Sequence, residues 1–93
     1  MSRVSLTAQV EDTLRRATTA FNAGRRDEAR RLCEAGLTHT PDEPALHHLL
    51  AAILFADGQP EAARKHIETS LRARPGHPQA QLLAARILDH VDD

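Results

Sequence analysis

Apolar residues recur at spacings of three and four along nearly the whole chain, the pattern of helices with one buried face. No segment alternates apolar and polar positions as a half-buried strand does. The first apolar series ends at Gly24, and Ser5 or Thr7 can cap its start. Four further segments share the helical spacing: residues 27–40, 44–57, 60–74 and 78–91. The pattern therefore predicts an all-α protein with five helices.

The connections between these segments contain helix start and stop signals. Asp42 or Glu43 can cap the third helix, and Pro44 suits its first turn because a proline there loses no helical hydrogen bond. Pro75 and Gly76 break the fourth helix. We therefore expect short, defined turns between the helices.

The same outline occurs twice, thirty-four residues apart. The segment NAGRRDEARRLCEAGLTHTP at 22–41 returns as ADGQPEAARKHIETSLRARP at 56–75. The matching positions include Gly24 and Gly58, Ala29 and Ala63, Arg30 and Arg64, Glu34 and Glu68, Leu37 and Leu71, and Pro41 and Pro75. Ala17, Ala51 and Ala85 form a further series, which places a small residue where the first helix of each pair approaches its neighbour. A helix–turn–helix unit repeated at this period is typical of a solenoid.

At these positions the chain resembles the tetratricopeptide repeat (TPR) family. The matching residues are Ala17, Gly24, Ala29, Leu37 and Pro41 in the first repeat and Ala51, Gly58, Ala63, Leu71 and Pro75 in the second. The resemblance covers about residues 10–91. It implies one domain over residues 1–93, with repeats at about 10–43 and 44–77 and a terminal helix at about 78–91.

Two departures from the family pattern bear on packing. The large aromatic residues common in the family are missing, with His47 in the place of a tryptophan. Gly36 stands within a helix where the family usually has alanine, and a helical glycine costs about 1 kcal/mol relative to alanine. Either the helices pack unusually closely at Gly36, or the first repeat is loosely built.

The resemblance implies a non-catalytic protein-binding function, often through a concave surface formed by the first helix of each repeat. In that register the surface contains Arg15, Thr18, Asn22, His48, Leu49, Ala52, Phe55, Leu82, Leu83 and Arg86. We expect a mostly apolar groove with an arginine at either end, suited to an amphipathic helix or to an extended peptide with one or two acidic anchors. The alternative is that much of this surface only closes the core. The clamp of Lys, Asn and Arg with which some TPR domains hold a C-terminal carboxylate is not expected, because the first helices carry no lysine.

The charge distribution argues against a nucleic-acid partner. The net charge is -1, so the chain as a whole does not attract phosphate. The arginines near residue 30 lie within one turn of Asp27, and Arg64 lies likewise beside Glu61, which predicts ordinary ion pairs on helix surfaces. Nucleic-acid binding is therefore only a distant third hypothesis.

Neither a signal peptide nor a membrane span of about 20 apolar residues is visible in the sequence. With no such span and a net charge of -1, no membrane partner is expected. The single cysteine, Cys33, cannot form an internal disulfide, which favours a reducing, cytoplasmic location. Cys33 also occupies the position of Ile67 in the second repeat, so we interpret it as a small buried hydrophobe and not as a nucleophile.

No arrangement in the sequence predicts an enzyme, a cofactor or a metal site. None of the six histidines has a second histidine four residues away on the same helix, and His47 and His48 point to different sides of theirs. We interpret the histidines as solvated or as lying at helix ends.

The terminal helix has more apolar residues than one neighbour can cover. Ala84, Ala85, Ile87 and Leu88 can pack on the second repeat, whereas Leu82, Leu83 and Val91 are left without a partner. A homodimer through these three residues is the favoured explanation. The alternatives are that the chain is a piece of a longer array, or that another protein covers the helix. The second hypothesis for function is accordingly a homo-oligomerisation or regulatory module of a larger protein or assembly.

Overall fold

The computed structural model describes residues 6–91, and all the regular secondary structure in this range is helical. The helices are α1 (Leu6–Asn22), α2 (Arg26–His39), α3 (Pro44–Ala56), α4 (Pro60–Ala73) and α5 (Pro78–Val91). The predicted all-α, five-helix class is confirmed. Ser5, one of the two expected caps of the first helix, lies outside the described residues, and Thr7 lies within α1, past the cap position.

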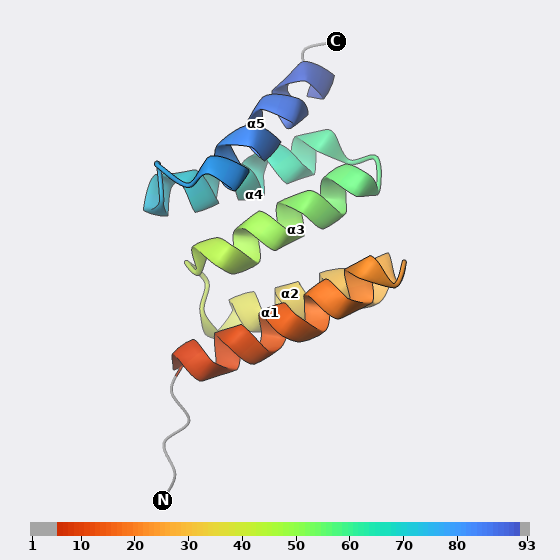
Figure 1. Ribbon diagram of the computed structural model, residues 1–93, viewed down its shortest axis with the longest axis vertical. Coiled ribbons are helices and arrows are strands. Elements are labelled where there is room, and N and C mark those ends of the chain that lie inside the picture. The colour runs from red at the N-terminus through yellow and green to blue at the C-terminus, as the bar shows by residue number, and fades with distance from the viewer. Residues whose placement is uncertain (1–5, 92–93) are drawn as a thin grey trace, which may run out of the picture.

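The helices stack in chain order. α1 packs against α2, α3 against α4, and α5 against α4 (Figure 1). α3 lies in the middle of the stack, where it also contacts α1, α2 and α5. The first helix of one pair therefore packs on both helices of the preceding pair, which is how a solenoid buries a continuous core.

Equivalent turns join the two helices within each pair. Gly24 and Gly58 adopt left-handed backbone conformations, with φ of 82° and 77°. Gly24 donates its N–H to the carbonyl of Phe21, and the next residue donates to the carbonyl of Ala20, 2.8 Å away. Gly58 and its successor make the same two bonds. These bonds define a Schellman motif, in which the left-handed residue is favoured as glycine because a Cβ is strained there.

The connections between pairs also follow physical rules. Pro44 is the first residue of α3, and the Glu43 carboxylate accepts a hydrogen bond from the Ala45 N–H, 3.2 Å away. Of the two predicted caps, Asp42 and Glu43, the structure therefore uses Glu43. Before α5, His77 caps the helix instead: its Nδ1 accepts from the Ala80 N–H at 3.2 Å. This histidine cap is not among the start signals predicted from the sequence.

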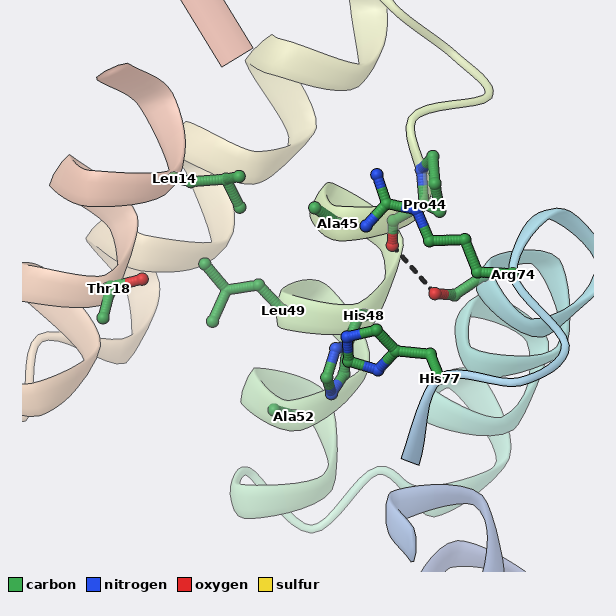
Figure 2. Close-up of a pocket in the computed structure, with 10 residues that line it drawn as sticks. Leu14, Thr18, Pro44, Ala45, His48, Leu49, Ala52, Arg74 and His77 are labelled. Atoms are coloured by element: carbon green, nitrogen blue, oxygen red, sulfur yellow. Dashed lines mark hydrogen bonds between the residues drawn. The ribbon is translucent and has the colours of Figure 1, made fainter. Parts of the chain in front are cut away.

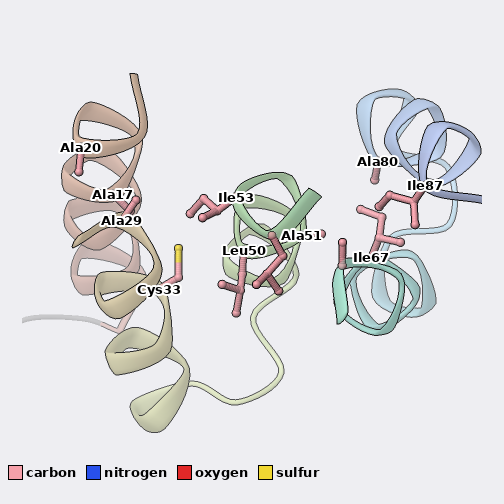
Figure 3. Packing of buried hydrophobic residues seen from close by; sticks show 12 residues of the cluster. Ala17, Ala20, Ala29, Cys33, Leu50, Ala51, Ile53, Ile67, Ala80 and Ile87 are labelled. Atoms are coloured by element: carbon pink, nitrogen blue, oxygen red, sulfur yellow. The ribbon is translucent and has the colours of Figure 1, made fainter. Parts of the chain in front are cut away.

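The core consists of small and aliphatic side chains that run from α1 to α5 (Figure 3). Ala17 and Ala51 are fully buried, as their shared register predicts. Gly36 is explained by close packing: a Cβ at this position would lie 2.9 Å from Leu46 Cδ1 and 3.1 Å from Thr13 Cγ2. The first of the two explanations for Gly36 is therefore the correct one.

Candidate functional site

A pocket of about 240 Å³ opens between α1, α3 and the connection that follows α4 (Figure 2). Its lining comes from Leu14 and Thr18 of α1, Pro44, Ala45, His48, Leu49 and Ala52 of α3, Ser70 at the end of α4, and Arg74 and His77 beyond it. The two first helices thus form one side of the pocket, and the connection between α4 and α5 forms the other.

The two sides of the pocket differ in chemistry. Leu14, Leu49 and Ala52 make the side formed by α1 and α3 mostly apolar, whereas Arg74 and His77 make the other side polar, with His48 of α3 packed on His77 (Figure 2). The Ser70 hydroxyl donates to the carbonyl of Pro44, 2.9 Å away. This bond fixes the end of α4 to the start of α3 and so holds the polar side in place.

His48 and His77 meet edge to face in this pocket, with ring centroids 5.4 Å apart and an angle of 74° between the rings. Burial, and then the neighbouring His77, lowers the pKa of His48 below its ordinary value of 6.5. Because His77 Nδ1 accepts the hydrogen bond from Ala80, its ring proton lies on Nε2. His77 therefore offers an N–H donor at Nε2.

Arg74 stands where this pocket joins a second hollow. The second hollow, of about 330 Å³, shares Leu14, Ala45 and Arg74 with the first and adds Thr7, Val10, Glu11 and Glu43. Arg74 takes part in none of the ion pairs that the structure shows between residues 6 and 91. The two hollows form one groove along α1 and α3, hereafter the α1–α3 groove, with Arg74 at its middle.

Four of the ten residues predicted for the binding surface line this groove. They are Thr18, His48, Leu49 and Ala52. Asn22 is exposed at the end of α1 and lines neither hollow. Arg15 pairs with Asp12 and lines a separate hollow between α1 and α2, so it does not form an end of the groove.

The other predicted groove residues lie towards α5. Phe55 packs edge to face on His90, with ring centroids 4.9 Å apart, and contacts the core, so α5 occupies the space in front of it. Arg86, Leu82 and Leu83 are on α5 and do not line the groove. The register predicted otherwise because it assumed that α5 lies beside α3 as α3 lies beside α1, which would have placed the α5 residues along the groove.

Sequence reasoning also missed the polar side of the groove. Arg74 and His77 were assigned only to a helix end and a turn, yet the chain folds them against the start of α3. The repeat places Ser70 at the position of Gly36, but it does not specify the path of the connection that carries Arg74 and His77.

The histidines are better ordered than predicted. His47 is buried, and its Nδ1 lies 3.0 Å from His66 Nδ1, while its Nε2 lies 2.7 Å from the carbonyl of Pro41. Burial, and then His47, lowers the pKa of His66, while Glu34 opposes this shift. The interpretation as solvated or helix-end residues is wrong for His47 and His66, which meet between α3 and α4, and for His48, which packs on His77. The described residues contain no group of three or more metal-binding side chains.

The predicted ion pairs are present in part. Arg30 lies 3.6 Å from Asp27, as expected, but Arg64 pairs with Glu68 at 3.3 Å and not with Glu61. Cys33 is buried, and burial followed by the charge of Glu34 raises the pKa of its thiol to about 12. The interpretation of Cys33 as a buried hydrophobe agrees with this environment.

The terminal helix requires a correction. Leu83 and Val91 are partly buried against the core, so they do have partners, whereas Leu88, expected to pack, is 44 % exposed. Ala85 is exposed too, although Ala17 and Ala51 at the same register are buried. Ala17 on α1 and Ala51 on α3 face the second helix of their own pair, α2 and α4 respectively. Among residues 6–91 no second helix follows α5, so Ala85 has no such helix to face.

Stacked helix pairs with a thirty-four-residue sequence period define an α-helical repeat solenoid. The family model described as tetratricopeptide repeat matches residues 14–78 and again residues 48–90, and the chain belongs to the TPR family. Members of this family are generally protein–protein interaction modules and are typically non-catalytic. Comparison with curated proteins and with solved structures gave no match. None of the helices within residues 6–91 has the length and apolar character needed to cross a membrane.

Proposed function

We propose that this chain is a non-catalytic adaptor module that holds a peptide or a helix of another protein in the α1–α3 groove. The observation that carries the proposal is the hollow of about 240 Å³ that α1 and α3 form with the end of α4. Its position on the first helices of both repeats is the one expected for a TPR partner, and we keep the repeat boundaries and the cytoplasmic location as predictions.

The shape and chemistry of the groove suit a chain segment. Leu14, Leu49 and Ala52 can cover one or two aliphatic side chains, and the polar groups opposite can fix the orientation of the segment. The groove continues past Arg74 into the second hollow, so it accommodates an extended or helical segment better than a compact small molecule.

Selection of displayed random peptides on the intact chain tests the proposal. Thr18 is exposed and lines the groove, so Thr18→Trp should fill it without disturbing the core and should abolish binding of the selected peptides. The control is Thr19→Trp, because Thr19 is also exposed on α1 but lines the hollow on the other side of the helix. Equal loss or equal retention of binding in both variants would show that the peptides bind elsewhere.

A second candidate function, self-association through α5, has its own observation. Leu82 is 58 % exposed and Leu88 44 %, and with Ala85 they form an apolar stripe at a spacing of three residues. We propose Leu82 and Leu88 as the centre of a homodimer contact, in place of the original set of Leu82, Leu83 and Val91.

Light scattering behind a sizing column, at several concentrations, tests this contact. A dimer that Leu82→Glu with Leu88→Glu converts to a monomer supports it, with Gln79→Glu as a control for added charge at an exposed position of α5. A mass of 10.2 kDa at every concentration contradicts it.

A further inference from the structure

We infer that the occupant of the α1–α3 groove is a protein segment with an acidic side chain next to an aliphatic one, and that Arg74 and His77 bind the carboxylate. This inference rests on the proposed function and specifies the chemistry of the partner. The aliphatic side chain lies against Leu14 and Leu49, and the acid lies across the pocket from it.

The position of Arg74 carries the first step. Its guanidinium lies at the edge of an apolar hollow and has no acidic partner within residues 6–91 (Figure 2). A guanidinium can donate two parallel hydrogen bonds to one carboxylate. Arg26, in contrast, already bonds to the Ala56 carbonyl at 2.9 Å and lies 3.8 Å from the Asp57 carboxylate.

The imidazoles of His48 and His77 are the second feature that favours a carboxylate. His77 uses Nδ1 to cap α5, so its Nε2–H is left as a donor on the side of the pocket that carries Arg74. His48 packs on His77 and places no negative charge there. An arginine beside an imidazole N–H donor favours a carboxylate, because an amine is itself a donor and an amide oxygen carries no negative charge to pair with the arginine.

The rest of the groove decides which carboxylate fits. The second hollow contains Glu11 and Glu43, whose charges disfavour an acid at that end of the groove. Since the groove continues on both sides of Arg74, a segment can pass this residue and does not need to end there. We therefore assign the carboxylate to an internal Asp or Glu of the partner and not to its chain terminus.

The test uses the peptides selected on the intact chain. We expect Asp or Glu to be enriched beside Leu, Ile or Val, and exchange of the acid for its amide to weaken binding roughly tenfold or more. Arg74→Gln should remove the difference between the acidic peptide and its amide version. Arg72→Gln is the matched control, because Arg72 is equally an exposed arginine at the end of α4 but lies outside the groove.

The outcomes separate this inference from the function on which it rests. Peptides that lack an acid but lose binding to Thr18→Trp overturn the inference and leave the groove as the binding site. The same holds for acidic peptides that bind Arg74→Gln as tightly as the unaltered chain. Peptides that bind Thr18→Trp normally, or a selection that enriches none, overturn both.

Discussion

The two helix pairs share one register but are held together by different chemistry. In the first pair, Gly36 lets α2 approach α1 so closely that a Cβ would lie 3.1 Å from Thr13 Cγ2. In the second pair the equivalent residue is Ser70, which reaches across to the carbonyl of Pro44, 2.9 Å away. Close packing in one pair and hydrogen bonding in the other thus produce the same helix arrangement, so the repeat specifies the positions of contacts more than their chemistry.

The same contrast appears at neighbouring positions. Cys33 and Ile67 are both buried at one register position, and Leu32 of the first pair corresponds to His66 of the second. His66 contacts the buried His47, whereas Leu32 is an apolar residue packed against the core. The second pair therefore has the larger buried side chain at this position, Ile67 in place of Cys33, and also a contact between two titratable groups, His47 and His66.

The largest effect that separates the pairs should come from removing buried volume. Ile67→Ala deletes three carbon atoms from a fully buried site and should lower the free energy of unfolding by about 3 kcal/mol. Cys33→Ala deletes a single sulfur atom at the equivalent position, and we expect a loss of about 1 kcal/mol. Urea unfolding followed by circular dichroism measures both. Equal losses would show that the two pairs contribute similarly despite their different side chains.

A smaller effect should come from the close contact of Gly36, on α2, with Leu46, on α3. Gly36→Ala gains about 1 kcal/mol of helix propensity. Its new methyl group, however, meets Leu46, which is fully buried, and overpacking costs about 1–3 kcal/mol. We expect a net loss of about 1 kcal/mol in the free energy of unfolding.

A double-mutant cycle isolates that contact. On a Leu46→Ala background the closer obstacle is gone and only Thr13 Cγ2, at 3.1 Å, remains, so Gly36→Ala should cost less stability than it does in the unaltered chain. At the equivalent positions of α4 and α5 the chain has Ser70 and Ala80, so a residue with a Cβ there corresponds to a small residue on the next helix. If Gly36→Ala were stabilising in the unaltered chain, Leu46 would have room to move and the close packing would not explain the glycine.

The sequence predicted the fold well because its signals are local and repeated. Gly24, Gly58 and Pro44 mark helix ends by backbone geometry alone, and each lies where these rules place it. The site was predicted in part: Thr18 and Leu49 follow from the helix register, whereas Arg74 and His77 do not. Their position depends on how the connection between α4 and α5 folds back on α3, and no periodic pattern specifies that path.

The placement of α5 explains the other errors. Register alone put Phe55 on an open surface, but α5 brings His90 onto its ring. Register likewise assigned Leu88 to the core, yet the helix turns Ile87 inward and leaves Leu88 exposed. The orientation of a terminal helix depends on one neighbouring pair only, so the repeat constrains it less than it constrains α3.

The smallest effect, and the one that most directly separates the pairs, should be a dependence of stability on pH. Burial lowers the pKa of both His66 and His48 below 6.5, so the unfolded chain binds protons at these two sites at a higher pH than the folded chain does. The stabilising contribution of each neutral imidazole is complete above about pH 6.5 and is lost as the pH falls below that value. The free energy of unfolding should therefore decrease between pH 7 and pH 5.

His66→Asn should reduce this decrease, because it removes one of the two groups. His39→Gln is the control, since His39 is exposed in the last turn of α2 and belongs to the first pair. Urea unfolding at several pH values provides the measurement, and the change with pH is compared between variants instead of the stability at any one pH.

Because His47 Nε2 lies 2.7 Å from the Pro41 carbonyl, which can only accept, that nitrogen must carry a proton, and His47 Nδ1 then accepts from His66. A protonated His66 still has a proton on Nδ1 and can keep this bond, so the bond itself does not oppose protonation. The loss of stability in acid then comes from placing a charge in a half-buried site beside His47, with Glu34 offsetting part of it. An identical pH dependence in His66→Asn and the unaltered chain would assign the acid sensitivity to other groups and remove this distinction between the two pairs.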